Sequence, residues 1–189
     1  AITTFRLEKT LSDKITAFSQ TNGVSLYMTL LAAYDVLLSK YSGQDDISVG
    51  ASIANRPQEE LEGLIGFFVN TLTLRNTVQP DSTFTQLLDQ VKQTTLEAYE
   101  HQDVPFEKIV EAVVKVRDPS RSPLFQVMLV LLNTPESSKL AFGDVELIGE
   151  GVPAAMSKFD LTLHVRELVN GLHFSVEYST DLFKASTIE

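Results

Sequence analysis

Residues 125–132, FQVMLVLL, are the feature that most limits how this chain can fold. Gln126 is the one polar side chain in this run, so a strand built from it is apolar on both faces. Such a strand must be covered on both faces, which is typical of an interior strand of a sheet. Helix-like and strand-like patterns alternate along the rest of the chain, and we therefore expect a layered α/β fold.

Length, charge and composition exclude several classes of protein. The chain has 189 residues, which suits one domain with a single core. It has no cysteine, so it can form no disulfide and no Cys-based metal site, and this fits a cytoplasmic protein. Its formal net charge of −10 argues against nucleic-acid binding. No apolar run approaches the roughly 18 residues that a membrane span needs, so we expect no membrane insertion.

Both ends of the sequence fall inside expected secondary structure. Residues 2–9 alternate like a strand and have no lead-in, whereas residues 181–189 begin like a helix and stop within its first turns. We therefore expect the chain to be a piece of a longer protein.

Residues 46–55 alternate as a strand with one apolar face and one face of small residues. The small face consists of Ser48, Gly50, Ser52 and Ala54. Small side chains let another backbone or a ligand come close. The pattern predicts either a closely packed helix on this face or the wall of a channel.

Residues 66–75, GFFVNTLTLR, are expected to form the next strand, and its first half is apolar on both faces. Asn70 lies on the same face as Phe68 and Leu72. A buried asparagine must find hydrogen-bond partners. Asn70 is therefore either a satisfied structural amide or a group that points toward a polar ligand.

Helices are expected over residues 13–22, 26–41, 84–100 and 105–115. Ser12 is the candidate cap of the first helix. Thr83 and Gln86 match a capping box at the start of the third. Pro105 is tolerated in the first turn of the fourth.

Asn170-Gly171 is the signature of a hairpin with a two-residue type I′ turn. That turn would pair residue 169 with residue 172. In this register Val165 faces Val176 on the apolar side, and His164 faces Glu177 on the wetter side. His164 is thus expected to be a cross-strand partner and not a catalyst.

No residue stands out as a catalyst, because the chain has no nucleophile elbow, phosphate-binding glycine loop or metal motif. His101 and Asp103 lie in a short connection between two helices, where the carboxylate can orient the imidazole or both can be structural. Arg117 and Arg121 can grip a phosphate by forked hydrogen bonds or tie their loop together through Asp118.

Three segments together resemble a known family. Residues 65–71, IGFFVNT, with Arg75 resemble the IGxFVNT…R motif of condensation domains from nonribosomal peptide synthetases. Residues 101–107, HQDVPFE, resemble their HQDxPFE motif. Residues 117–124, RDPSRSPL, resemble their RDxSRxPL motif, and the order and spacing also agree.

The resemblance implies a function and a set of partners. A condensation domain forms an amide bond between an acyl or peptidyl donor and an aminoacyl acceptor in the biosynthesis of antibiotics and other secondary metabolites. Both substrates are thioesters on phosphopantetheine arms of upstream and downstream carrier proteins, beside an adenylation domain. No cofactor is then expected to bind the chain directly. The implied fold is a chloramphenicol-acetyltransferase-like subdomain, with a mixed sheet packed with helices.

The resemblance also implies which part of the domain this is. The catalytic motif His-His-x-x-x-Asp-Gly belongs to the N-terminal subdomain, and no two histidines are adjacent in this chain. Residues 1–189 therefore match the C-terminal subdomain, which should be inactive alone, with the N-terminal subdomain as its partner. Residues 133–157 are the candidate element that reaches across to that subdomain.

The family assigns positions to the candidate residues. The expected tunnel wall consists of Ser48, Gly50, Ser52, Gly66, Phe68, Asn70 and Gln126. Structural roles are expected for His101, Asp103, Pro105, Arg117, Asp118 and Arg121, with the two arginines alternatively near the path of the pantetheine arm. No catalytic residue and no metal ligand is expected in this chain.

Three other functions remain open beside peptide-bond formation. One is a domain that has lost catalysis and recruits other enzymes as a docking platform. Another is a relative that epimerises or heterocyclises. The last is a free acyltransferase that uses a soluble thioester.

Overall fold

The computed structural model describes residues 1–189 except residues 57, 62, 117, 133–140, 143–144 and 147–155. Its strands are β1 (Ile2–Glu8), β2 (Asp46–Ile53), β3 (Asn70–Thr77), β4 (Val127–Leu132), β5 (Ala141–Phe142), β6 (Val145–Glu146), β7 (Leu161–Leu168) and β8 (Gly171–Tyr178). Its helices are α1 (Lys9–Thr21), α2 (Leu26–Ser42), α3 (Phe84–Glu100), α4 (Phe106–Val113) and α5 (Ala185–Ile188), with a short 3₁₀ turn at Glu59–Leu61.

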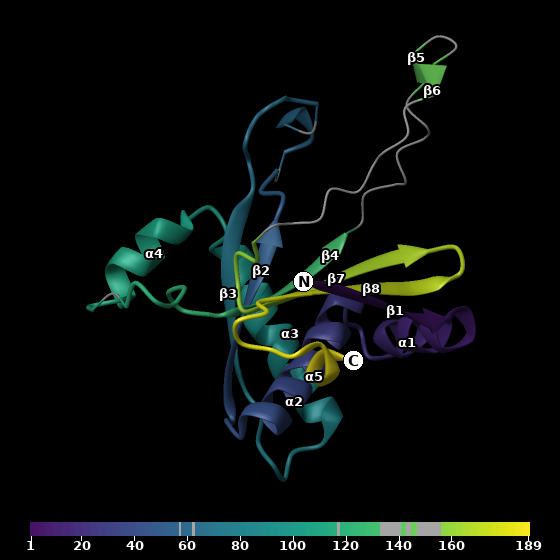
Figure 1. Ribbon diagram of the computed structural model, residues 1–189, viewed down its shortest axis with the longest axis horizontal. Coiled ribbons are helices and arrows are strands. Elements are labelled where there is room, and N and C mark those ends of the chain that lie inside the picture. Colours follow the sequence, from purple (N-terminus) through teal and green to yellow (C-terminus); the bar gives the residue numbers. More distant parts are fainter. Residues whose placement is uncertain (57, 62, 117, 133–140, 143–144, 147–155) are drawn as a thin grey trace.

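Six strands form one mixed sheet in the order β1-β8-β7-β4-β2-β3 (Figure 1). β4 lies between β7 and β2 and runs parallel to both, while the outer pairs are antiparallel. The expectation that residues 125–132 form an interior strand is confirmed in position for 127–132, but of these only Met128 and Leu129 are buried, so the strand is not fully covered on both faces. Phe125 and Gln126 precede the strand.

The core lies between the sheet and helices α2 and α3. Side chains that are completely buried come from every layer of this core: Leu31, Val49, Leu74, Leu88, Val91, Leu129, Val165 and Leu172. α1 packs against α2 and β8 on the same side. α4 stands apart beyond β3, at the end of the sheet where the motif segments meet (Figure 1).

Local sequence signals located α3 correctly. Thr83 Oγ1 accepts from the backbone N–H of Gln86 at 3.3 Å, and Gln86 Oε1 accepts from the N–H of Thr83 at 2.8 Å. This reciprocal pair is the expected capping box. The predicted cap at Ser12 is wrong, because α1 begins at Lys9. Ser12 instead accepts from the N–H of Leu172 at 2.9 Å and so joins α1 to β8.

The β7–β8 hairpin has a different register from the predicted one. Leu168 pairs with Gly171, so the two-residue loop is Val169-Asn170. Gly171 has φ +125°, and a side chain there would overlap the carbonyl oxygen of Leu7 in β1. The close approach of β1 therefore requires glycine at this position, and the glycine is not part of a type I′ turn.

The shifted register changes the partners of the hairpin residues. Val165 lies opposite Phe174, and His164 lies opposite Ser175 and not Glu177. Because the shift is by two residues, each side chain stays on its expected face.

The predicted strand at 66–75 is wrong in its first half. β3 begins at Asn70 and is an edge strand, since only β2 pairs with it. Residues 64–69 form a loop that leaves four large apolar side chains in solvent: Leu64, Ile65, Phe67 and Val69. The candidate bridging element at 133–157 lies largely outside the described residues; the short strands β5 and β6 are the described elements within it.

Candidate functional site

The three motif segments, far apart in the sequence, line one cleft at the β3 end of the sheet. The cleft has a volume of about 740 Å³, and we call it the motif cleft. Its wall includes Phe67, Phe68, Asn70 and Thr71 from the first motif, Asp103, Pro105, Phe106 and Glu107 from the second, and Ser122 and Pro123 from the third. Ser52, Asn55, Val69, Phe125, Met128, Lys158 and Phe159 complete it.

Only some of the expected tunnel residues lie in this wall. Ser52, Phe68 and Asn70 line the motif cleft. Gly66 packs under the Phe68 ring, which would lie 2.9 Å from a Cβ at that position. The remaining candidates, Ser48, Gly50 and Gln126, are not among the lining residues of this cleft.

Asn70 connects β3 to the turn between α3 and α4. Its Nδ2 donates to the carbonyl oxygens of Gln102 and Val104 at 2.7 and 2.8 Å. Its Oδ1 accepts from the N–H groups of Thr71 at 2.8 Å and Phe106 at 3.3 Å. The amide is thus fully used by backbone groups, which fits the structural alternative for this residue.

Asn55 is a polar group of the cleft that sequence reasoning missed. Its Oδ1 is buried and has no hydrogen-bond partner among the described residues. Its backbone has φ +48°, a left-handed conformation that asparagine tolerates better than most residues. A buried acceptor without a partner is unusual and favours a polar ligand at this point of the wall.

Gly50 explains the small face of β2. Phe125 is 1% exposed, and a side chain at residue 50 would overlap its ring. Phe125 also contacts the rings of Phe106 and Phe159, with centroids 5.6 and 5.4 Å apart. An aromatic ring covers this glycine, whereas the sequence suggested a helix or a channel.

Arg56 holds the loop between β2 and β3. Its guanidinium donates to the carbonyl oxygens of Leu61 and Leu64 at 2.6 and 2.8 Å. The same group lies 4.3 Å from the centroid of the Phe68 ring, which is a cation–π contact. One side chain thus positions Phe68 in the cleft wall.

Arg75, at the end of the first motif, forms a structural ion pair. Its Nε donates to Asp46 Oδ1 at 2.8 Å across the β2–β3 ladder. This hydrogen bond lowers the pKa of the Asp46 carboxyl. Both groups are exposed, so the pair contributes little to stability.

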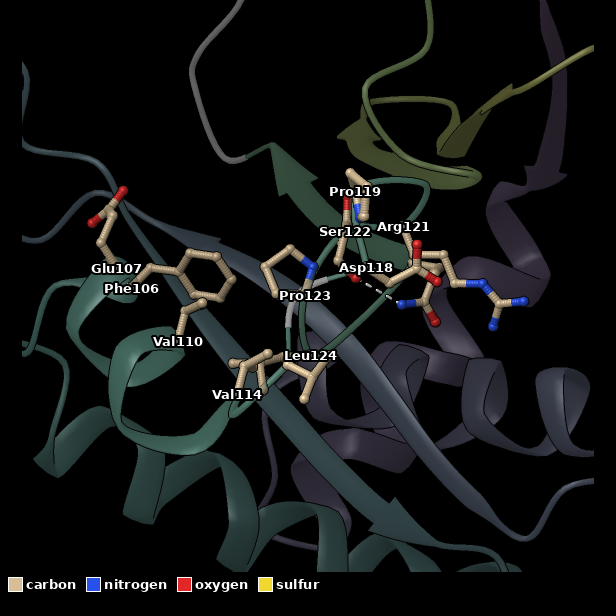
Figure 2. Close-up of a pocket in the computed structure, with 12 residues that line it drawn as sticks. Phe106, Glu107, Val110, Val114, Asp118, Pro119, Arg121, Ser122, Pro123 and Leu124 are labelled. Atoms are coloured by element: carbon tan, nitrogen blue, oxygen red, sulfur yellow. Dashed lines mark hydrogen bonds between the residues drawn. The ribbon is translucent and has the colours of Figure 1, made fainter.

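Residues 118–124 and helix α4 enclose a second hollow of about 580 Å³, which we call the loop groove. Figure 2 shows Phe106 and Val110 of α4, and Val114 directly after the helix, facing Pro123 and Leu124 of the loop. Gln126 belongs to this groove, where its Nε2 donates to the carbonyl oxygen of Ser122 at 2.9 Å.

Asp118 orders its loop through Ser120. The carboxylate accepts from the Ser120 N–H and Oγ at 2.9 and 2.6 Å. These hydrogen bonds, and to a smaller extent the charge of Arg121, lower the pKa of Asp118. Arg121 is exposed and forms no ion pair with a described residue. Arg117 lies outside the described residues.

His164 and His173 lie in the β7–β8 hairpin, whereas His101 lies at the end of α3. His101 ends α3 and is exposed, and its side chain makes no hydrogen bond to Asp103 or to any other described residue. Pro105 caps α4, and its carbonyl oxygen accepts from Lys108 at 2.9 Å. Within the described part of the chain, no three His, Asp or Glu side chains are grouped to hold a metal ion. No helix there is long and apolar enough to cross a membrane.

A model of the condensation-domain family matches residues 1–189, so the chain belongs to this family. It is 47% identical over 186 residues to one of the plipastatin synthase proteins of Bacillus subtilis (strain 168). That alignment covers 98% of this chain but 5% of the relative's length, so the chain corresponds to a small part of a much larger protein.

Solved structures of this family share the fold. One is holo-AB3403, a four-domain nonribosomal peptide synthetase bound to AMP and glycine, with a TM-score of 0.91 and 25% identity over 99% of this chain and 15% of that one. Another is the X-domain from teicoplanin biosynthesis, with a TM-score of 0.89 and 24% identity over 100% of this chain and 43% of that one. The expected chloramphenicol-acetyltransferase-like α/β fold with a mixed sheet is thereby confirmed.

Proposed function

We propose that this chain is the C-terminal subdomain of a condensation domain that forms amide bonds in a nonribosomal peptide synthetase. The observation that carries the proposal is the motif cleft, in which all three family motifs meet. The family match over residues 1–189 supports the same assignment.

The chain's own part in the reaction is to wall the path of the substrates. No His-His-x-x-x-Asp-Gly motif occurs in the sequence, so the histidine beside the attacking amine, whether it acts as a base or positions the amine, comes from the N-terminal subdomain. Phe68 and the aromatic cluster around Phe125 give the cleft an apolar wall, and Ser52 adds a small polar side chain to it. Asn55 supplies a hydrogen-bond acceptor to a bound amide or amine.

The proposed partners are the N-terminal subdomain, two carrier proteins that bear phosphopantetheine, and an adenylation domain. The multidomain architecture of the synthetase relatives supports this set. Phosphopantetheine arrives covalently on the carrier proteins, so the chain needs no cofactor of its own. A cytoplasmic location accompanies this proposal and rests on the cysteine-free composition.

The docking-platform alternative is kept because the fold does not separate the two functions. A solved complex of the X-domain with OxyB from teicoplanin biosynthesis, in which a domain of this fold binds another protein, matches with a TM-score of 0.88, against 0.91 for the four-domain synthetase. The discriminating residue is therefore the second histidine of the upstream motif, outside these 189 residues.

The decisive experiment restores the missing half. This chain is co-expressed with the N-terminal condensation subdomain of the plipastatin synthase relative, and the complex is mixed with loaded donor and acceptor carrier proteins. Mass spectrometry should detect the amide product on the acceptor carrier. Replacing the second histidine of the partner's motif by alanine is the matched control and should abolish it. A folded complex that binds both carriers but yields no product would favour the docking platform.

A further inference from the structure

The face of the sheet opposite α2 and α3 carries a row of basic side chains. In the β1–β8 ladder Arg6 lies opposite His173, and in the β8–β7 ladder His173 lies opposite Arg166. These three residues therefore stand side by side across three adjacent strands, about 5 Å apart from strand to strand.

The neighbouring row also consists of hydrogen-bond donors. Thr4 lies opposite Ser175, and Ser175 lies opposite His164. These residues are two positions along each strand from the basic row, so they share its face of the sheet. All six side chains of the two rows line one hollow of about 760 Å³, which we call the sheet-face hollow.

Almost none of these donors has a partner. His173 Nε2 contacts Asn170 Oδ1 at 2.7 Å, which fixes the imidazole beside the turn. The other five side chains form no hydrogen bond or ion pair with any described residue. Arg6 and Arg166 are the charged groups of this row, and a bound anion would interact favourably with both guanidinium groups.

The carboxylates on this face lie near the ends of strands β1 and β8. Glu177 lines the hollow, but it is four residues from His173 along β8, which is about 13 Å. Glu8 follows Arg6 by two residues at the start of α1 and is exposed. Arg6 and Arg166 have no carboxylate partner among the described residues.

We propose that the sheet-face hollow is a binding site for a phosphate group, either free or as a monoester. The forked guanidinium groups of Arg6 and Arg166 match the geometry of phosphate oxygens from two sides. His173, Ser175 and Thr4 supply further donors between them. Ile2, Leu132 and Leu168 form an apolar rim that can contact the organic part of an ester.

The site does not depend on the proposed role in amide-bond formation, since it uses none of the motif residues. Its test therefore needs no partner subdomain. Inorganic phosphate and phenyl phosphate are titrated into the 189-residue chain, and amide ¹⁵N–¹H chemical shifts are followed. Sodium chloride at matched ionic strength is the reference. Saturable shifts in β1, β7 and β8 are expected with both phosphate probes and absent with chloride.

Four variants make the assignment specific. Arg6→Gln and Arg166→Gln should each weaken phosphate binding by about tenfold or more, because each removes a charge-assisted hydrogen bond. Lys115→Ala removes a positive charge from the exposed segment after α4 and should leave the affinity unchanged. Glu177→Gln should tighten binding, because it removes the one carboxylate that lines the hollow.

The outcomes separate the source of the phosphate as well as the existence of the site. Equal affinities for the two probes indicate a free anion, and tighter binding of phenyl phosphate indicates an ester that uses the apolar rim. The proposal is overturned if phosphate produces no saturable shift beyond the chloride reference. It is equally overturned if the two arginine variants, folded by circular dichroism, bind as Lys115→Ala does.

Discussion

Asn76 Nδ2 donates to Asp35 Oδ2 at 2.8 Å in the core between α2 and β3, where the two residues are 1% and 0% exposed. The other oxygens of this pair, Asp35 Oδ1 and Asn76 Oδ1, have no partner among the described residues, and neither has the hydroxyl of Tyr34. Burial raises the pKa of Asp35 to about 7, although the hydrogen bond from Asn76 opposes the shift. When Asp35 is ionised, its Oδ1 is a buried acceptor without a partner. A proton on this oxygen makes it a donor and removes the buried charge, so this carboxyl is more stable in its neutral form.

The buried acid predicts that stability falls as the pH rises. In the unfolded chain an aspartate loses its proton near pH 4, whereas folded Asp35 keeps it to about pH 7. Between these values the folded state binds more protons, so the free energy of unfolding should fall by up to about 1.4 kcal/mol per pH unit. Above about pH 7 this group adds no further pH dependence.

Asp35→Asn should remove this slope, because the amide cannot titrate and can still pair with Asn76. Urea unfolding of both proteins from pH 4.5 to 8 measures it. The control is Asp46→Asn, which neutralises an exposed carboxylate with a lowered pKa and should leave the slope between pH 5 and 7 in place. Parallel pH profiles for Asp35→Asn and the unmodified chain would contradict the neutral acid.

Gly50→Ala should destabilise the fold by about 1–3 kcal/mol, because overpacking a filled core costs that much. The added methyl would overlap the Phe125 ring, which is itself held between Phe106 and Phe159. Gly63→Ala is the matched control, since nothing lies within 4 Å of a Cβ at that position. Urea midpoints of the two variants provide the comparison. Equal midpoints would show that Phe125 does not cover Gly50.

Substitutions of Asn70 should lower the stability of the fold, whereas substitution of Asn55 should affect product formation and not stability. Asn70→Ala removes bonds to three backbone groups of the α3–α4 connection and should cost about 1–3 kcal/mol. Asn70→Asp should cost at least as much, because it places a carboxylate oxygen against the carbonyls of Gln102 and Val104.

Asn55→Gly should leave the stability nearly unchanged, because glycine accepts the positive φ and the lost oxygen has no partner among the described residues. In the restored complex with the N-terminal subdomain, the same change should lower the rate of product formation. Thermal unfolding of the chain measures the effect on stability, and the carrier-protein assay measures the effect on product formation. A destabilised Asn55→Gly that retains full activity would assign Asn55 to the fold.

Sequence patterns predicted the elements whose signals are local. The capping box of Thr83 and Gln86 lies within four consecutive residues. The apolar run at 125–132 predicts a strand from its own residue types. The start of α1 and the register of the hairpin were missed because they depend on contacts between distant segments. Ser12 contacts Leu172, and Gly171 is required by the approach of Leu7.

The candidate site was also predicted only in part, because it too depends on contacts between distant segments. The resemblance identified the three motif segments, and these do meet in one cleft. The continuous apolar run at residues 66–69 was misassigned to an interior strand, because an exposed apolar loop has the same sequence pattern. Asn55 and Phe125 could not be recognised from their neighbours in the sequence. The role of Asn55 depends on its positive backbone φ, and the role of Phe125 depends on its contact with Gly50 in β2.

The exposed apolar loop leads to the last prediction. The small face of residues 46–55 is not fully open, because Phe125 covers Gly50 on it. Ile65 and Phe67 are instead 105% and 92% exposed in the adjacent loop. Apolar patches of this kind are typical of surfaces that associate. We expect the isolated chain to bind an apolar fluorescent dye and to self-associate weakly in sedimentation velocity.

Ile65→Ser combined with Phe67→Ser should reduce both signals. Val169→Ser is the control, because Val169 is 92% exposed but lies alone at the β7–β8 turn. Neither change removes a buried contact, so thermal unfolding should stay close to that of the unmodified chain. If the control lowers dye binding and association as much as the double variant does, the loop at residues 64–69 is not the associating surface.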